Sequence, residues 1–187
     1  MRGAILALSL AAVVSAAQAA SVEDRSFLDA DGKRVLRESV IVDATPGQVW
    51  CAFTTDEGFA KWGAPVVHIV PGNGGSMEFA PMPNGKIGDP YNVRHRIDVY
   101  QPNELLIFHN EFVPAGGPID AGLFPTVRTV LTFEAVSPST TRVTETVVGF
   151  GTGTAYDGLY EHLRAGNAEY LVMLAAAMGN AHFQQVR

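Results

Sequence analysis

The sequence predicts an α+β fold in which a curved antiparallel sheet wraps around one long C-terminal helix, with two short helices after the first strand. Two short helical patterns follow an early strand, and six strand-like stretches then follow one another with short turns rich in glycine, proline and asparagine. Short connections favour antiparallel pairing. One amphipathic helical pattern ends the chain, and a sheet of this size must bend to bury its apolar face against a single helix.

Length and composition indicate one folded domain. The chain has 187 residues, of which 47 % are hydrophobic and 17 % charged, as is typical of globular proteins and not of disordered ones. We expect a lead-in segment over 20–34, the folded domain over 35–180 and a tail over 181–187. The net charge of −6 makes nucleic acid and anionic membrane surfaces poor partners. The single cysteine, Cys51, excludes an internal disulfide, and its apolar surroundings predict a buried thiol.

Residues 1–19 have the pattern of a secretory signal peptide. Arg2 supplies a short positive segment, residues 4–14 supply an apolar segment, and Ala17-Gln18-Ala19 is an A-x-A cleavage motif. Cleavage after Ala19 removes one arginine and no acid, which changes the net charge from −6 to −7. The apolar run is short for a membrane span, although an uncleaved anchor is the alternative. We therefore expect a periplasmic or secreted protein with no stable membrane insertion after cleavage.

The first elements of the domain are a strand over 35–43 and two short helices. A polar lead-in with an Asp31-Gly32 turn precedes the strand and predicts either an irregular segment or a short hairpin. Thr45 followed by Pro46 predicts a helix start, because a hydroxyl caps the first turn and proline fits the first helical position. Asp56 begins the second short helix.

The next six stretches are expected to be strands. They lie at residues 66–70, 75–80, 91–100, 104–113, 126–136 and 141–150. In YNVRHRIDVY (91–100), Val93, His95, Ile97 and Val99 alternate with polar residues and should share one face. The polar face must meet water, so His95 is expected on the face that points into the protein. It is there either as a core histidine satisfied by a neighbour or as a residue that looks into a cavity.

The final pattern predicts a long helix that ends near Met178. Its apolar stripe consists of Tyr160, Leu163, Asn167, Tyr170, Leu171, Leu174 and Met178. Gly179-Asn180 provides a C-terminal stop. A strongly bent sheet around such a helix has a concave face that side chains fill poorly, so a cavity is expected between the two.

Several stretches resemble the SRPBCC superfamily, the helix-grip fold of START domains and Bet v 1-like proteins, and within it the branch named for the activator of Hsp90 ATPase homologue. They are Val42–Pro65, Gly74–Phe79, Ile97–Glu111, Thr129–Thr146 and Tyr160–Met178. The resemblance implies a helix-grip fold over almost the whole chain after residue 34. The chain departs from the pattern at Gly166-Asn167, where such proteins often carry Gly-Trp, which predicts a larger and more polar cavity. An exported chain would not meet a cytosolic chaperone, so we do not expect Hsp90 as a partner.

Regular alternation and the fold together predict which side chains contact a ligand. The candidates are Phe53, Trp62, Met77, Phe79, His95, Phe108, Asn110, Phe112, Phe133, Tyr160, Leu163, Asn167, Tyr170 and Leu171. Mostly apolar and aromatic with a few polar points, this set is typical of a pocket for a small hydrophobic or amphipathic molecule. An enzyme of the cyclase or isomerase type, using His95 with Tyr160, Tyr170 or Asn167, is one alternative. An interaction module with a filled core is the other.

Some features leave two interpretations open. Glu145 shares a face with Val143 and Val147 in TRVTETVV, but burial of a carboxylate is costly, so an outward orientation is favoured. The glycine- and proline-rich stretch 113–124 is either a lid over the cavity or a loose surface connection. His109 and His162 are expected to face solvent. The histidine spacing suggests no metal site, and no cofactor is implied.

Overall fold

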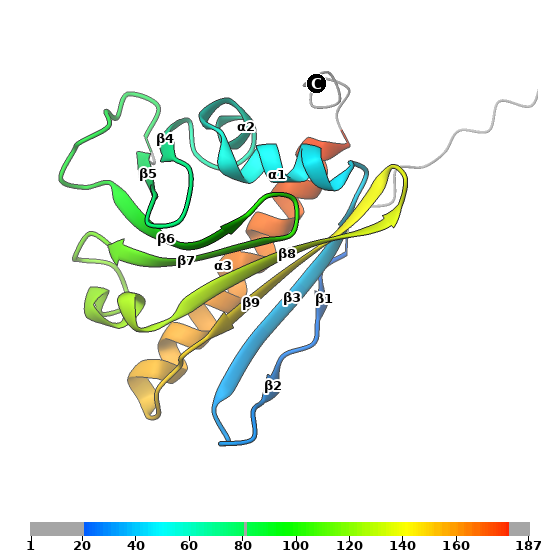
Figure 1. Ribbon diagram of the computed structural model, residues 1–187. Coiled ribbons are helices and arrows are strands. Elements are labelled where there is room, and N and C mark those ends of the chain that lie inside the picture. The colour runs from blue at the N-terminus through cyan, green and yellow to red at the C-terminus, as the bar shows by residue number, and fades with distance from the viewer. Residues whose placement is uncertain (1–20, 81, 180–187) are drawn as a thin grey trace, which may run out of the picture.

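The computed structural model describes residues 21–80 and 82–179, so the predicted signal peptide and the tail lie outside the described residues. One antiparallel sheet curves around a long helix, in the strand order β1-β3-β9-β8-β7-β6-β5-β4, with β2 also paired to β3 (Figure 1). This is the predicted helix-grip architecture. In the described part of the chain, no helix is both long enough and apolar enough to cross a membrane.

The elements fall close to their predicted positions. The strands are β1 (Glu23–Asp24), β2 (Phe27–Leu28), β3 (Arg34–Val42), β4 (Val66–Val70), β5 (Ser76–Ala80), β6 (Val93–Gln101), β7 (Leu105–Phe112), β8 (Arg128–Ser137) and β9 (Thr140–Val148). The helices are α1 (Pro46–Thr54), α2 (Asp56–Ala60), the 3-10 helix η1 (Ala121–Thr126) and α3 (Thr154–Met178). The polar lead-in thus forms two short strands on the edge of β3.

The start of α1 has the predicted cap. The Thr45 hydroxyl accepts a hydrogen bond from the backbone N–H of Gln48, and the Gln48 side chain accepts one from the N–H of Thr45. These reciprocal bonds satisfy two donors that the first turn would otherwise leave open. Cys51 lies on this helix as a free thiol and is half-buried, not buried as expected, because the neighbouring residues Trp50, Ala52 and Phe53 form the buried side of α1.

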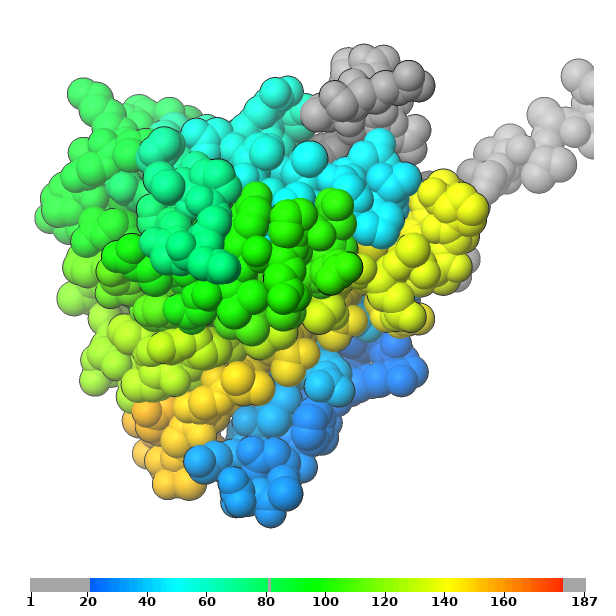
Figure 2. All heavy atoms as spheres, viewed as in Figure 1, coloured from blue at the N-terminus to red at the C-terminus, as the bar shows by residue number. Residues whose placement is uncertain are grey.

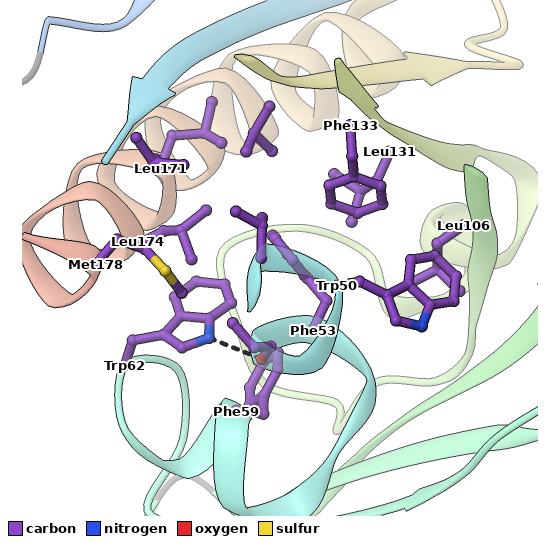
Figure 3. Packing of buried hydrophobic residues seen from close by; sticks show 14 of the residues in the cluster. Trp50, Phe53, Phe59, Trp62, Leu106, Leu131, Phe133, Leu171, Leu174 and Met178 are labelled. Carbon is purple, nitrogen blue, oxygen red and sulfur yellow. Dashed lines mark hydrogen bonds between the residues drawn. The ribbon is translucent and has the colours of Figure 1, made fainter. Parts of the chain in front are cut away.

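Two apolar clusters divide the interior. The first packs α1, α2 and the C-terminal half of α3 against the sheet and includes Trp50, Phe53, Phe59, Trp62, Leu106, Leu131, Phe133, Leu171, Leu174 and Met178 (Figure 3). The Trp62 indole N–H donates to the carbonyl of Ala52 at 2.9 Å, which ties the segment after α2 to α1. The second cluster consists of Leu36, Phe124, Val127, Val147, Phe150, Leu159 and Tyr160.

Two register shifts change which side chains of β6 and β7 face inward. Ile97 pairs with Phe108 but Val99 pairs with Ile107, so Asp98 is an extra residue on β6. Since paired residues share a face, Val99 turns outward, contrary to the regular alternation that we expected. Tyr100 takes the inward position and packs against Trp50, with 4.8 Å between the ring centroids.

The second shift occurs near the end of β7. His95 pairs with Asn110 and Arg94 pairs with Phe112, so Glu111 is an extra residue. Phe112 therefore lies on the outer face, where the Arg94 guanidinium sits 4.2 Å from its ring centroid. The prediction that Phe112 faces the concave side was wrong for this reason.

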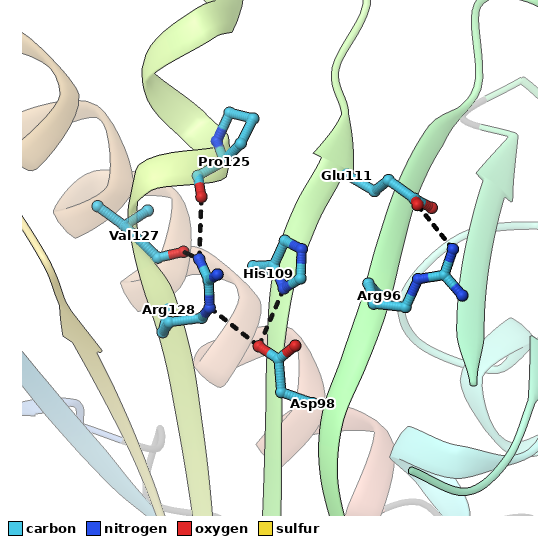
Figure 4. Close-up of polar contacts among 7 residues, drawn as sticks. All are labelled: Arg96, Asp98, His109, Glu111, Pro125, Val127 and Arg128. Carbon is cyan, nitrogen blue, oxygen red and sulfur yellow. Dashed lines mark hydrogen bonds and ion pairs between the residues drawn. The ribbon is translucent and has the colours of Figure 1, made fainter. Parts of the chain in front are cut away.

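The outer face of the sheet carries the polar network that the alternation predicts. Asp98 pairs with Arg128 at 3.0 Å and with His109 at 2.9 Å, and Arg96 pairs with Glu111 at 2.7 Å (Figure 4). Figure 2 shows this face, with α3 largely hidden behind the sheet. His109 is thus on the outer face, as expected. The inner face is left for the core and the cavity.

Candidate functional site

A cavity of about 470 Å³ lies between the concave face of the sheet, the segment around α2 and the middle of α3. Eleven of the fourteen predicted ligand contacts line it: Phe53, Trp62, Met77, Phe79, His95, Phe108, Asn110, Leu163, Asn167, Tyr170 and Leu171. Other lining residues come from the same elements and from the loop after β7, among them Phe59, Val113, Phe124, Thr129, Glu145 and His162. The volume falls within the range of small-molecule pockets.

Three predicted contacts lie elsewhere. Phe112 is on the outer face because of the shift at Glu111. Phe133 is buried in the first cluster, with its ring 5.6 Å from those of Trp50 and Phe53. Tyr160 packs against Phe150 in the second cluster. A cyclase-type site could therefore not use Tyr160 in this cavity.

A polar layer separates the two apolar clusters. On β3, Glu38 lies between Leu36 of the second cluster and Val40 of the first. Glu145 has the same position on β9, Thr129 on β8 and Asn167 on α3, since each is flanked along its element by residues of the two clusters. Three of these four line the cavity, and Glu38 stands directly behind Glu145. The cavity therefore meets polar groups across its middle and apolar groups at its ends.

Glu145 points inward, so the favoured outward orientation was wrong. It pairs with Leu131 on one side and with Glu38 on the other, and all three share the inner face. Side chains directly opposite in an antiparallel pair have Cβ atoms about 5 Å apart, so the two carboxyl groups are close neighbours. The alternation of Val143 and Val147 already pointed to this arrangement, and only the cost of burying a charge argued against it.

Both carboxyl groups are held in a state that resists ionisation. Burial raises the pKa of Glu145 to about 8, and the neighbouring Glu38 charge adds to the rise. Burial likewise raises the pKa of Glu38 to about 7, where Asp24 adds to the rise and Arg164 opposes it. Near neutral pH, the pair therefore carries at least one proton and can donate a hydrogen bond.

His95 is stacked inside the cavity wall. Its ring lies 4.9 Å from that of Phe108 at an interplanar angle of 11°, and Phe79 meets it edge-on at 5.0 Å. Burial lowers the pKa of His95 to about 4, and a hydrogen bond with Asn110 opposes this only in part. The imidazole is therefore neutral at physiological pH.

Buried polar atoms without a partner gather at this site. Among the described residues that are not exposed, the side-chain atoms of this kind are Nδ1 of His95, Nδ2 of Asn167 and Oε2 of Glu38. Two of the three residues line the cavity, and the third supports Glu145. Since buried polar groups are normally hydrogen-bonded, these atoms are available to form hydrogen bonds with a guest molecule. The expectation that a neighbour satisfies His95 is met only in part, because Asn110 hydrogen-bonds the ring while Nδ1 has no partner.

The loop over residues 113–124 packs against α3 at the mouth of the cavity. Phe124 of η1 meets His162 edge-on with 5.9 Å between ring centroids, and both line the cavity. Val113, Ile119 and Leu123 pack against the second cluster. His162 is exposed, as predicted, but borders the opening. The loop is thus a packed part of the cavity wall.

Metal binding has no support in the described part of the chain, where no group of three His, Cys, Asp or Glu side chains could hold an ion. Sequence reasoning missed Glu38 and Phe59 as parts of the site. Glu38 could have been found, because RVLRESVIV places it on the same face as Leu36 and Val40. Phe59, on α2, lines the cavity beside Trp62.

Comparison with known proteins identifies the fold independently. A family model described as "Activator of Hsp90 ATPase homolog 1-like protein" matches residues 43–179. The solution structure of the Aha1 dimer from Colwellia psychrerythraea is similar at a TM-score of 0.58 and 18% identity, covering 77% of this chain and 95% of that one. CalU16 from Micromonospora echinospora is similar at a TM-score of 0.58 and 14% identity, covering 89% of this chain and 90% of that one.

A third similar structure is the di-domain ARO/CYC BexL from the BE-7585A biosynthetic pathway, at a TM-score of 0.59 and 17% identity. The match covers 78% of this chain and 46% of that one. No curated protein sequence matches the chain. Identities this low establish a shared fold and leave the function to the site itself.

Proposed function

Because the chain belongs to the family of Activator of Hsp90 ATPase homolog 1-like proteins, whose fold is shared by proteins of diverse roles, we propose its function from its cavity: it binds a small hydrophobic or amphipathic molecule there. The observation that carries the proposal is a space of about 470 Å³ in which buried, unpartnered polar atoms of His95 and Asn167 face mostly apolar walls. Apolar walls supply affinity, and a few convergent polar groups fix orientation.

The size of the cavity weighs against the interaction module with a filled core. A space of about 470 Å³ is larger than the lower limit of about 300 Å³ for small-molecule pockets. Leaving such a space empty costs stability, because the lining side chains lose packing contacts. A guest that fills it offsets this cost.

The proposal includes export. The first nineteen residues have the composition of a signal peptide, and the mature chain would begin at Ala20. A mature protein outside the cytoplasm would not assist a cytosolic chaperone, whatever the family's name suggests. Intact-mass measurement of the protein from its native host tests this part, since a chain that retains residues 1–19 would contradict it.

Native mass spectrometry of the purified mature protein, followed by solvent extraction, tests the binding function. We expect a stoichiometric small-molecule adduct that Asn167→Trp removes, because an indole at this position would occupy the cavity. Ser139→Trp, at an exposed position in the β8–β9 turn, serves as a matched control and should keep the adduct. An adduct that survives Asn167→Trp would place the ligand elsewhere and overturn the proposal.

One observation favours a second candidate, an enzyme. A neutral imidazole at His95 and a protonated carboxyl at Glu145 line the same cavity, and such a pair can exchange protons with one substrate. If the protein is an enzyme, His95→Ala protein should purify with a substrate that differs from the molecule carried by the wild type in mass or, for an isomerisation, in chromatographic retention. Identical adducts in both proteins would exclude turnover through His95.

A further inference from the structure

We propose that the guest of this cavity is a hydrophobic organic cation, such as a lipophilic amine, whose charged group lies against Glu145. This inference rests on the proposed binding function and adds the charge of the ligand. It follows from three features of the described residues: a pair of inward carboxyl groups, the lack of a cation among the cavity's lining residues, and an aromatic wall.

The carboxyl pair is the first feature. Glu38 and Glu145 are directly opposite each other on β3 and β9, on the face that α3 covers. Glu38 is 3 % exposed, and its Oε2 atom has no hydrogen-bond partner. Glu145 is partly buried beside it, and two neighbouring carboxyl groups in such surroundings destabilise the fold unless a proton or a cation neutralises them. In the protein alone a proton does so, because burial raises the pKa values of both groups.

The described part of the chain places no cation inside the cavity. No Lys or Arg is found among the described residues that line the cavity. Arg164, the cation whose field reaches Glu38, is engaged by Glu161 at 2.8 Å on the exposed side of α3. Arg34 is likewise engaged by Asp157 at 3.1 Å. His95 stays neutral because burial lowers its pKa.

The aromatic wall suits a cation that also carries apolar groups. Seven of the lining side chains have aromatic carbocyclic or indole rings: Phe53, Phe59, Trp62, Phe79, Phe108, Phe124 and Tyr170. The faces of such rings are electronegative and attract an ammonium group that has left water. The apolar remainder of an amine would contact the same rings. A simple inorganic cation has no apolar groups with which to contact these rings.

The arrangement also distinguishes the proposal from its alternatives. An anion such as a fatty-acid carboxylate would meet Glu145 with no lining Lys or Arg to compensate, so we expect it to be rejected. A neutral guest could accept a hydrogen bond from protonated Glu145, but its affinity would fall as that proton is lost. A cation gains affinity when Glu145 ionises. The pH dependence of binding therefore has opposite signs for the two.

The expected pH dependence involves every titratable or charged group around the pair. From the sheet these are Asp24 and His95, and from α3 they are Arg164, Tyr170 and the mouth residue His162. His95 is deprotonated above its lowered pKa of about 4, whereas burial raises the pKa of Tyr170 above its usual value of 10.0. Neither changes charge between pH 6.8 and 8.5. His162 lies at the mouth, and the variant His162→Gln serves as the control for its contribution to the pH dependence of binding.

Calorimetric titration of the mature protein with three probes, each with a chain of ten carbons, tests the proposal. The probes are decyltrimethylammonium, a permanent cation; decyldimethylamine N-oxide, its near-isosteric neutral counterpart; and decanoate, an anion. We expect the cation to bind at least tenfold more tightly than decanoate at pH 8, with an affinity that rises from pH 6.8 to 8.5. Titration at pH 7 in two buffers of different ionisation enthalpy should show release of about one proton from the carboxyl pair to solvent.

Glu145→Gln should abolish the preference for the cation and its pH dependence while binding of the N-oxide persists. Glu134→Gln, a carboxyl with 74% of its side chain exposed on β8, is the matched control and should behave as the wild type. Binding of the N-oxide with no preference for the cation, or a preference that Glu145→Gln leaves intact, would overturn the cation assignment and leave the proposed function standing. Failure of all three probes to bind would count against the proposed function itself.

Discussion

Replacement of Glu145 by glutamine should make the protein more stable at alkaline pH and change its stability little at acidic pH. In the folded state, burial raises the pKa of Glu145 from 4.5 to about 8, so the folded protein keeps a proton that the unfolded chain releases. The stability that this carboxyl permits is therefore fully present below pH 4.5 and is lost as the pH rises through about 8. Glutamine has the same shape and no charge to bury.

The size of the effect follows from the pKa shift. One unit of pKa difference between the two states corresponds to about 1.4 kcal/mol. Structural relaxation and the proton shared with Glu38 make the effect smaller than the free energy that corresponds to the whole pKa shift. We therefore expect the free energy of unfolding of Glu145→Gln to exceed that of the wild type by about 2 kcal/mol at pH 8.5. His95 has the opposite dependence, since its lowered pKa makes the wild type lose stability as the pH falls from 6.5 to about 4. This contribution of His95 to stability is the same in the wild type and in Glu145→Gln.

Urea denaturation of the chain beginning at Ala20, monitored by tryptophan fluorescence at pH 5 and pH 8.5, measures the difference in free energy of unfolding between the two proteins. Glu134→Gln should match the wild type at both values, because its carboxyl is largely exposed. A stability gain that is equal at the two pH values would refute the reasoning, since it would show that ionisation of Glu145 is not what destabilises the protein.

Other predictions concern the scaffold and use the same denaturation assay. Thr45→Ala should cost about 1 kcal/mol because it removes the hydroxyl that caps α1, and Thr45→Ser should restore most of it; equal losses would show that the cap is not the cause. Gly149→Ala should cost about 2 kcal/mol, because φ is +94° and a Cβ would stand 2.8 Å from the Thr126 carbonyl oxygen, whereas Gly117→Ala, which meets no neighbour, should cost far less. Asp98→Asn should cost under 1 kcal/mol, since its partners His109 and Arg128 lie on the outer face of the sheet. A larger loss would mean that these ion pairs stabilise the bulge at Asp98.

Local sequence patterns were sufficient to predict most of the fold. Thr45 and Pro46 define the start of α1, and Val66–Val70 has the predicted bounds of β4. These signals depend only on neighbouring residues, so they survive in a single sequence. Eleven cavity residues also followed from alternation and helical spacing.

The failures have a common physical origin in pairing between strands. Phe112 and Val99 face outward because each follows an extra residue in its strand, which shifts the alternation of side chains. Only the pairing with the neighbouring strand reveals such an extra residue. Glu145 faces inward because Val143 and Val147 fix the phase of β9, and their burial outweighs the cost of burying one carboxyl group. Protonation makes that cost tolerable, and it follows from burial of Glu145 first and then from Glu38, on a strand distant in the sequence.

The extra residue at Glu111 has a consequence for how this fold diversifies. Deleting that one residue would place Phe112 directly after Asn110, where regular alternation keeps it opposite Arg94 on the outer face and leaves Val113 at the cavity. A three-nucleotide deletion here would thus shorten β7 without exchanging any side chain of the pocket. Gain and loss of single residues at such bulges would let this end of the sheet change length while the interior, the helix and the other strands stay unchanged.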